Sequence, residues 1–232
     1  MESNDIFYSK DVILMRKNPP FDLQFVYITY ILEFLYKNDV LIINNPKSLR
    51  DYNEKISTLS FKYAPKTLIT CKKQSIYLFQ EEVGDIILKP LNNMGGASVF
   101  YLKKNDVNTS VIIDNLTNYQ NNFCMIQEYI ADIIHGDRRI IIINGIPIPR
   151  CLVRIPIDGE IRGNLAAGAI YEIQNLRKID YDIISKINIT SPTGVREIES
   201  AYPISISSIL LDNIENILNK KHFKEISIFN KI

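Results

Sequence analysis

The sequence predicts a mixed fold of α/β and α+β character, in which a parallel strand–helix–strand unit precedes antiparallel strands and helices. Two short apolar runs, at residues 12–15 and 40–43, flank a segment with helical periodicity. Further apolar runs alternate with helix-like segments, and Asn144-Gly145 separates two of these runs in the manner of a hairpin turn. The 232 residues are enough for one large domain or two small ones.

The N-terminal unit begins with residues 12–15, which predict a short buried strand. The following apolar residues recur at the spacing of one helix face: Leu23, Val26, Tyr27, Tyr30, Ile31, Phe34 and Leu35. Residues 40–43 predict a second buried strand, and Asn44-Asn45-Pro46 predicts a turn. Two strands joined by one helix indicate a parallel pair. One such unit is the end of a domain rather than a whole one.

The remaining elements follow from short apolar runs and their flanking turn residues. Helices are expected at residues 51–61, 72–82 and 205–218. Strands are expected at residues 67–71, 85–89, 99–103, 123–129, 138–143 and 148–155. The last two of these strands flank Asn144-Gly145 and therefore form a hairpin.

Composition excludes several classes of partner. The chain carries 27 basic and 26 acidic residues, which gives no electrostatic reason to expect a nucleic acid or a membrane surface as partner. No apolar run approaches the length of a bilayer, and the first residues lack a secretory signal pattern. Cys71, Cys124 and Cys151 lack metal-ligand spacing and are expected to be reduced residues of a cytoplasmic protein.

Three groups of polar residues could carry chemistry. Lys89 ends a predicted buried strand and is followed by Gly95-Gly96-Ala97-Ser98, where glycines let backbone N–H groups approach phosphate oxygens. Without other support, such a glycine pair is more often a plain turn. Arg150 and Arg154 share one face of a strand, and Arg139 and Arg162 lie nearby in sequence. Arginines gathered there suit a polyanion or a carboxylate, whereas a solvated sheet face is the alternative.

The third group surrounds Asn188, a polar residue in a short apolar run that needs a partner if it is buried. Mg²⁺ held between protein oxygens and phosphates would provide one, and a turn role for Ser191-Pro192-Thr193-Gly194 is equally natural. His135 and His222 are too isolated to indicate nucleophilic catalysis.

Taken in order, seven segments resemble successive signatures of the bacterial glutathione synthetase family. They cover most of the chain from about residue 11 to residue 218. They are residues 12–22, 49–55, 86–91, 94–98, 136–139, 162–168 and 187–193.

The resemblance implies an ATP-grasp fold, in which two α+β subdomains clasp ATP, at residues 46–222. Residues 1–45 would be the remnant of a Rossmann-like domain that precedes it, and residues 223–232 a tail. The implied enzyme is an ATP-dependent ligase that joins γ-glutamylcysteine to glycine through an acyl phosphate. Charge builds up on the transferring phosphoryl group and water would hydrolyse the intermediate, so such a site must be cationic and closed. The implied metal is Mg²⁺, with Mn²⁺ as the alternative. The resemblance leaves the oligomeric state open, with a homo-oligomer as one alternative.

Site residues follow from the resemblance position by position. Arg139 and Arg154 are the expected catalytic residues, and Arg16 and Arg196 are candidates for binding the peptide carboxylates. Asn188 matches a magnesium ligand. The residues that match nucleotide-binding positions are Lys55, Lys89, Gly95, Gly96, Ala97, Gln127, Glu128, Tyr129, Asp137 and Asn164.

The chain departs from the family pattern in three places. Only the last strand–helix–strand of the preceding domain is recognised, and the interval from Gly168 to Asn188 is too short for the family's usual elements. Asp182, or else Asp180, would then replace the family's aspartate ligand. Lys186 stands where the family has a metal-bridging glutamate, and a cation there repels Mg²⁺. The alternative function is therefore a catalytically inactive, nucleotide-binding remnant of the family.

Overall fold

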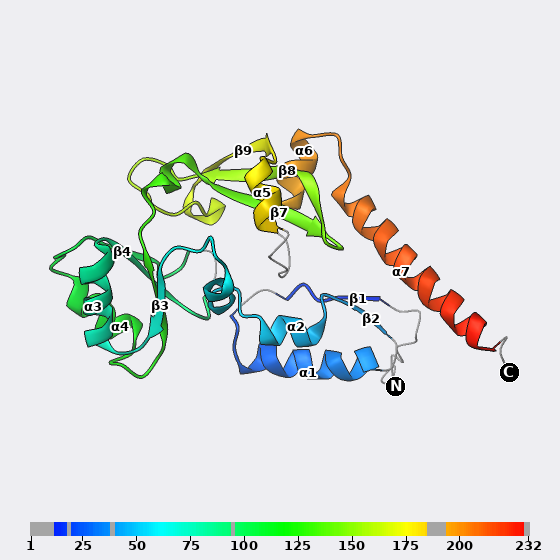
Figure 1. Ribbon diagram of the computed structural model, residues 1–232, viewed down its shortest axis with the longest axis horizontal. Helices are drawn as coiled ribbons and strands as arrows, with labels where there is room; N and C mark the ends of the chain where they lie inside the picture. Colours follow the sequence, from blue (N-terminus) through cyan, green and yellow to red (C-terminus); the bar gives the residue numbers. More distant parts are fainter. Residues whose placement is uncertain (1–11, 18–19, 38–39, 94–95, 185–193, 230–232) are drawn as a thin grey trace, which may run out of the picture.

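The computed structural model describes residues 12–17, 20–37, 40–93, 96–184 and 194–229. Within them the strands form three separate sheets of two, four and three strands. Figure 1 shows the two larger sheets with their own helices, and the two-stranded sheet beneath with α1 and α2. Among these residues no helix combines the length and the apolar character needed to cross a membrane.

The N-terminal unit has the predicted parallel strand–helix–strand form. β1 (Val12–Leu14) pairs in parallel with β2 (Leu41–Ile43), and α1 (Leu23–Lys37) connects them. Phe25 and Leu32 of α1 pack against Ile42 in a buried cluster. These residues are apolar and lie on one side of the helix, which explains why the period-3.6 pattern predicted the element correctly.

The helix predicted at residues 51–61 is wrong. α2 runs from Pro46 to Asp51, so the predicted turn at residues 44–46 is a helix N-terminus, where the side chain of Asn45 accepts a hydrogen bond from the Ser48 N–H at 3.1 Å. The helix then ends because Asn53 competes for backbone groups. Its Oδ1 accepts from the N–H groups of Lys55 and Ile56, and a short 3₁₀ helix, η1 (Ile56–Ser60), follows.

The four-stranded sheet has the order β3-β6-β4-β5, and all of its strand pairs are antiparallel. Two helices pack on this sheet, α3 (Lys73–Val83) and α4 (Thr109–Leu116). Ile76 of α3 and Ile113 of α4 are fully buried with Leu88 and Ile126 in a single core cluster. The elements of this region are β3 (Thr67–Thr70), α3 (Lys73–Val83), β4 (Ile86–Pro90), β5 (Phe100–Leu102), α4 (Thr109–Leu116) and β6 (Cys124–Glu128). The loop between β4 and β5 contains the predicted glycine segment.

The three-stranded antiparallel sheet consists of β7 (Asp137–Ile143), β8 (Ile146–Ile155) and β9 (Ile170–Asn175). Asn144 and Gly145 have φ values of 50° and 80°, which confirms the hairpin predicted from their sequence. Helices α6 (Val195–Ala201) and α7 (Ile206–Phe229) close the core on this sheet through Ile198 and Ile206, which contact Ile141 and Leu152.

Several elements were not predicted. They are α4, β9, α5 (Lys178–Ile184), α6 and the 3₁₀ helices η2 (Ala131–His135) and η3 (Leu165–Ala167). The final helix was predicted at residues 205–218 but runs from Ile206 to Phe229. The three cysteines are free thiols, as expected, and two of them are buried.

Candidate active site

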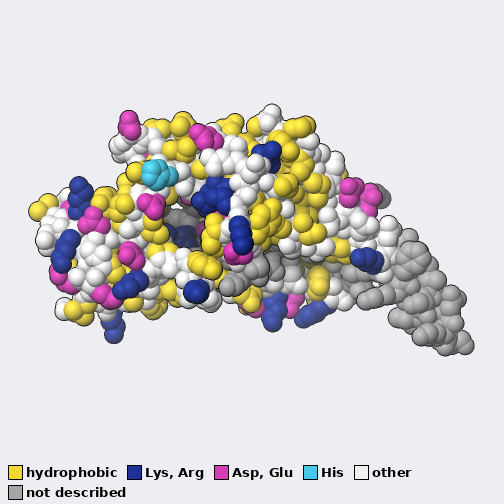
Figure 2. All heavy atoms as spheres, turned by 45° about the horizontal axis from the view of Figure 1, so that its top comes forward, with side chains coloured by type: hydrophobic (Ala, Val, Ile, Leu, Met, Phe, Trp, Pro, Cys, Tyr) yellow, Lys and Arg dark blue, Asp and Glu magenta, His cyan; other side chains and the backbone are white. Residues whose placement is uncertain are grey.

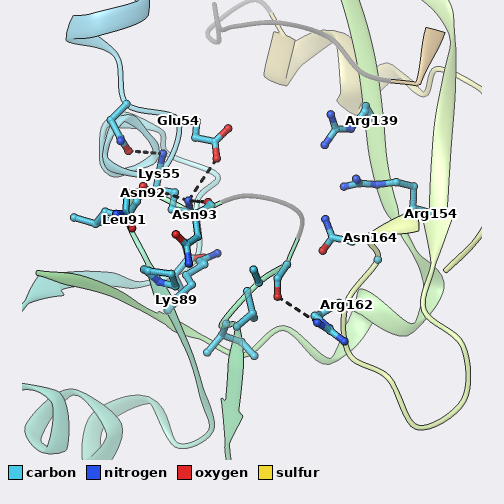
Figure 3. Close-up of a pocket in the computed structure, with 18 of the residues that line it drawn as sticks. Glu54, Lys55, Lys89, Leu91, Asn92, Asn93, Arg139, Arg154, Arg162 and Asn164 are labelled. Carbon is cyan, nitrogen blue, oxygen red and sulfur yellow. Dashed lines mark hydrogen bonds and ion pairs between the residues drawn. The ribbon is translucent and has the colours of Figure 1, made fainter. Parts of the chain in front are cut away.

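A cavity of about 760 Å³ lies between the four-stranded and the three-stranded sheets. One wall comes from β4, β6 and the segments beside them, and the other comes from β7, β8 and the loop after β8. Figure 2 shows basic side chains around a hollow near the middle of this face. In Figure 3, Lys55 and Lys89 lie across the cavity from Arg139 and Arg154. The arrangement places four cations, from segments far apart in sequence, around one space.

The first wall carries the two lysines. Lys89 lies on β4, and burial, followed by the charge of Lys55, lowers the pKa of its ammonium. Lys55 reaches the segment after β4, where its Nζ donates to the carbonyl oxygens of Asn93 at 2.5 Å and Leu91 at 3.3 Å. Lys55 therefore braces the base of the glycine loop, while Lys89 presents a poorly solvated charge to the cavity.

The glycine loop reaches the opposite wall at Gly96. This residue has a φ of 80°, and a Cβ built on it would lie only 2.6 Å from Oδ1 of Asn164. Its carbonyl oxygen accepts a hydrogen bond from Nη1 of Arg162 at 3.3 Å. Only glycine suits both the backbone angle and this close approach. Ala97 lines the cavity beside it, whereas Gly95 lies outside the described residues.

The second wall carries the arginines. Asp137 on β7 stands opposite Arg154 on β8 in the strand register, and Arg154 Nε donates to Asp137 Oδ1 at 2.7 Å, with a second bond between the two side chains. Burial, followed by the charge of Arg154, lowers the pKa of Arg139. Arg150 belongs to the same strand, but its guanidinium lies 4.0 Å from the ring centroid of Tyr202 and does not line the cavity.

The end of β6 contributes Gln127, Glu128 and Tyr129 to the cavity lining. Two of their backbone donors are already used inside the protein. The Glu128 N–H donates to the backbone carbonyl oxygen of Lys66, and the Tyr129 N–H donates to that of Asp85, each at 3.0 Å. Ile130 also lines the cavity, and within the described part of the chain its N–H donates to no protein acceptor. Ile130 is thus the backbone donor that this edge offers to a ligand.

The other residues expected at the site divide into three groups. Arg16 and Asn164 line the cavity. Arg196 is exposed on α6 and Asp182 is exposed on α5, and neither lines it. Asn188, together with the Lys186 that departs from the family pattern, lies outside the described residues.

Asp180, the alternative to Asp182, is buried away from the cavity. Its carboxylate accepts from Arg138 Nε at 3.1 Å and from the backbone N–H of Arg177 at 2.8 Å. Burial raises the pKa of this group, but the bonds from Arg177 and the charges of both arginines leave it lowered. Asp180 and Arg138 therefore join α5 to the three-stranded sheet.

Four charged residues at the cavity, Lys17, Glu54, Arg162 and Glu197, were absent from the predicted site. Glu54 and Glu197 line it, and each directly neighbours a predicted residue, Lys55 and Arg196 respectively. Arg162 also lines it. The sequence grouped Arg162 with the arginines that suit a polyanion, but the resemblance gave it no role at the site.

The carboxylates around the cavity do not by themselves build a metal site. No group of three or more His, Cys, Asp or Glu side chains among the described residues is placed to hold a metal ion. Asp137, a predicted nucleotide-binding residue, is engaged by Arg154 and does not itself line the cavity, whereas the carboxylates of Glu54, Glu128 and Glu197 do. Hard oxygen ligands for Mg²⁺ would have to come largely from phosphate and from residues beyond this set.

Comparison with known families gives two matches along the chain. The prokaryotic glutathione synthetase ATP-grasp domain matches residues 54–187, and the prokaryotic glutathione synthetase N-terminal domain matches residues 4–50. The first match alone covers more than half of the 232 residues. The chain belongs to the prokaryotic glutathione synthetase family. This family is one of ATP-dependent ligases with an ATP-grasp domain.

Curated members of the family are similar over most of their length. A glutathione synthetase from Wigglesworthia glossinidia brevipalpis is 65% identical, with 91% of this chain and 75% of the relative covered. One from Vibrio cholerae serotype O1 is 47% identical, with 90% and 73% covered. The first alignment spans 236 positions, although 91% of this chain is only about 211 residues. About 25 positions of the relative thus have no counterpart here, in agreement with the internal shortening predicted from the sequence.

Solved structures support the fold. D-cycloserine synthetase DcsG has a TM-score of 0.58 at 12% identity, with 79% of this chain and 66% of that chain covered. D-alanyl-alanine synthetase A from Vibrio cholerae has a TM-score of 0.52 at 13% identity, with 75% and 56% covered. At these identities the likeness concerns the fold alone, and it confirms the ATP-grasp architecture expected from the sequence.

Proposed function

We propose that this chain catalyses the ATP-dependent joining of γ-glutamylcysteine and glycine. The observation that carries the proposal is the cavity in which Lys55 and Lys89 oppose Arg139 and Arg154 across a glycine loop. A triphosphate and a peptide carboxylate are both anions, and together they need several cations in one enclosed space. Membership of the glutathione synthetase family supplies the substrate class.

In the proposed complex, the adenine base lies at the end of β6, where the Ile130 N–H is available to donate a hydrogen bond to a ring nitrogen. The phosphates extend toward Lys89 and the glycine loop. Lys89 holds the phosphates as a point charge, because its low solvation strengthens the attraction to an anion. ATP supplies the phosphoryl group that activates the peptide carboxylate.

The arginine wall orients that carboxylate. Asp137 fixes the plane of the Arg154 guanidinium, and the remaining N–H groups of such a fork match a carboxylate or a phosphoryl oxygen. Arg139, whose pKa is lowered but which stays charged at neutral pH, adds a second cation on the adjacent strand. Arg16 lies at the N-terminal side of the cavity and is suited to a second substrate carboxylate.

We assign the metal to Mg²⁺, with Asn188 as a protein ligand and phosphate oxygens as the main ones. Asn188 lies outside the described residues, so no step of the mechanism is attributed to the metal. Arg196 is not retained as a substrate-binding residue, nor Asp182 as a metal ligand, because both are exposed and neither lines the cavity.

The test measures phosphate release by the purified chain with ATP, Mg²⁺, γ-glutamylcysteine and glycine, and with each component omitted in turn. We expect release only when all four are present. In parallel, a thermal-shift titration with ATP is run with and without Mg²⁺, because a ligand that binds only the folded state raises its midpoint.

The two measurements separate the proposal from the inactive remnant. A thermal shift with ATP but no phosphate release under any condition would identify a nucleotide-binding protein without ligase activity. Activity that appears only in a Lys186→Glu variant would assign that loss to the residue at position 186. The absence of both a shift and release would contradict the proposed function altogether.

A further inference from the structure

The two walls of the cavity are fastened to each other by Arg162. Its Nη1 donates to the carbonyl oxygen of Gly96, which belongs to the opposite wall, at 3.3 Å. Gly96 itself packs against this part of the chain, since a Cβ added to it would lie 2.6 Å from Asn164 and 3.1 Å from Arg162. The glycine loop therefore touches the loop after β8 and closes one side of the cavity.

Glu160 holds Arg162 in the geometry that makes this contact. Oε1 of Glu160 accepts from Arg162 Nε at 3.0 Å, and Oε2 accepts from Nη2 at 2.5 Å. The same Oε1 also accepts from the backbone N–H groups of Ile161 and Arg162, at 2.8 and 3.1 Å. The carboxylate thus occupies one edge of the guanidinium and leaves Nη1 directed across the cavity. Such a bidentate pair fixes the plane of the guanidinium.

The low exposure of both side chains shows that Glu160 and Arg162 form an ion pair rather than two separately solvated charges. The side chain of Glu160 is 20% exposed and that of Arg162 is 35% exposed. Arg162 lines the cavity, whereas Glu160 stands behind it and does not. The bond from Arg162 lowers the pKa of Glu160 to about 2, so the carboxylate stays charged at any pH at which the enzyme would work.

We propose that Glu160 is a positioning residue, which acts through Arg162 to latch the glycine loop against the opposite wall and so slows nucleotide release. This inference rests on the proposed function, since it takes the cavity to hold a nucleotide. Glu160 itself does not touch the nucleotide. Glu160 acts by fixing the direction in which Nη1 of Arg162 points. It should therefore affect the rate of nucleotide release more than the rate of the chemical step.

The experiment follows release of a fluorescent ATP analogue, labelled on its ribose, from the full-length chain by stopped-flow after a chase with unlabelled ATP. For Glu160→Gln we expect the release rate to rise about tenfold, the effect of one lost charge-assisted hydrogen bond. The association rate should stay unchanged. The apo melting temperature should fall slightly, because glutamine keeps the shape of the side chain but loses the charge that pairs with Arg162. Glu81→Gln, which removes an exposed carboxylate paired with Lys104, is the matched control.

Non-additivity shows whether Glu160 acts through Arg162. We expect Arg162→Lys to raise the release rate as well, because an ammonium cannot make the two-sided contact. Adding Glu160→Gln to that variant should change the rate by less than about twofold, since coupled residues do not add. Full additivity would overturn the latch. So would an unchanged release rate in Glu160→Gln, or a lower melting temperature with unchanged release.

Gly96, the residue that Arg162 contacts, allows a second test of the latch. Gly96→Ala places a Cβ against Asn164 at a positive φ and should separate the walls, which would also raise the release rate. Gly145→Ala is the control, because Gly145 has the same φ of 80° but nothing within 4 Å of its added Cβ. If the native chain fails to bind the analogue, the proposed function falls and the latch falls with it. If it binds and all variants release it alike, the latch alone is wrong.

Discussion

The two walls of the cavity use cations in different ways. The wall from the four-stranded sheet carries lysines. Lys55 lies 3.5 Å from a carboxylate oxygen of Glu54, whereas no carboxylate among the described residues forms an ion pair with Lys89, whose pKa is lowered by burial and by the charge of Lys55. The wall from the three-stranded sheet carries arginines that are bound to carboxylates, Arg154 to Asp137 and Arg162 to Glu160. One wall presents ammonium groups, which act as point charges, and the other presents planar guanidinium groups of fixed direction.

This difference suggests a division of labour. A triphosphate is a dense charge whose oxygens can be met from many directions, so an ammonium on a flexible stem is sufficient. A carboxylate that must be attacked along one line requires a planar donor held in place, which a guanidinium paired on its far edge provides. The lysine wall should therefore provide most of the direct attraction for the nucleotide, and Arg154 of the arginine wall should determine turnover. Arg162 differs from Arg154, because it acts on nucleotide release through its contact with the glycine loop.

The sharpest test of this division is Arg154→Lys. The substitution keeps the positive charge but loses the fork that Asp137 holds, so we expect turnover to fall about a hundredfold while the affinity for ATP changes little. Steady-state kinetics and a nucleotide titration measure the two effects separately. Arg150→Lys is the control, since Arg150 lies on the same strand but over Tyr202, outside the cavity. An equal loss in ATP affinity would show that the arginine wall also binds the nucleotide.

Lys89→Met tests the lysine wall and should separate affinity from stability. We expect ATP affinity to fall about tenfold, because a charge-assisted contact with phosphate is lost. The melting temperature should rise by about 2–4 °C, because the buried ammonium destabilises the folded state. Lys62→Met, at an exposed lysine, should change neither quantity.

The pH dependence of Lys89 has a definite sign. Its pKa is lowered in the folded protein, so the unfolded chain binds the proton more tightly. The free energy of unfolding of the native chain should therefore rise with pH between the lowered pKa and the ordinary lysine pKa. This rise should be absent in Lys89→Met. A variant that melts at a lower temperature than the native chain would show that Lys89 stabilises the fold through contacts instead.

The fold could be predicted from the sequence wherever the local pattern agreed with the tertiary environment. The apolar runs of β4 and β6 are buried strands, and Asn144-Gly145 has the two positive φ values that its turn requires. The prediction failed at residues 51–61, because the hydrogen bonds of the Asn53 side chain are invisible in periodicity. It missed β9, whose exposed Ile170 and Tyr171 give no clean alternation of apolar and polar residues.

Single residues of the candidate site could be predicted from the sequence, but the side-chain pairs that these residues form could not. Lys55 and Lys89 were named from recognised segments and Arg154 from a matching position between two of them, and all three line the cavity. The pairing of Arg154 with Asp137 depends on the register of β7 against β8, which follows from the bulge near Ile140 and Ile142. A sequence without its strand register cannot show which carboxylate faces which arginine.

The smallest expected effect concerns the end of β6, which belongs to the lysine wall but contributes no cation to it. Tyr101 packs on Tyr129 with ring centroids 4.4 Å apart, and its hydroxyl donates to Asp85 Oδ2 at 2.5 Å. The carbonyl of the same Asp85 accepts the Tyr129 N–H. Tyr101 thus supports the segment that presents the Ile130 N–H to the cavity, without carrying charge itself.

For Tyr101→Phe we therefore expect the KM for ATP to rise about threefold with kcat unchanged, as for the loss of one neutral-donor hydrogen bond at a partly exposed site. The Asp85 bond raises the pKa of Tyr101 to about 12 and lowers that of Asp85, so the difference from the native chain should be constant between about pH 6 and 9. Tyr77→Phe on α3 is the matched control. A fall in kcat instead of a rise in KM would mean that the lysine wall also positions the reacting groups, and the division between the two walls would then be wrong.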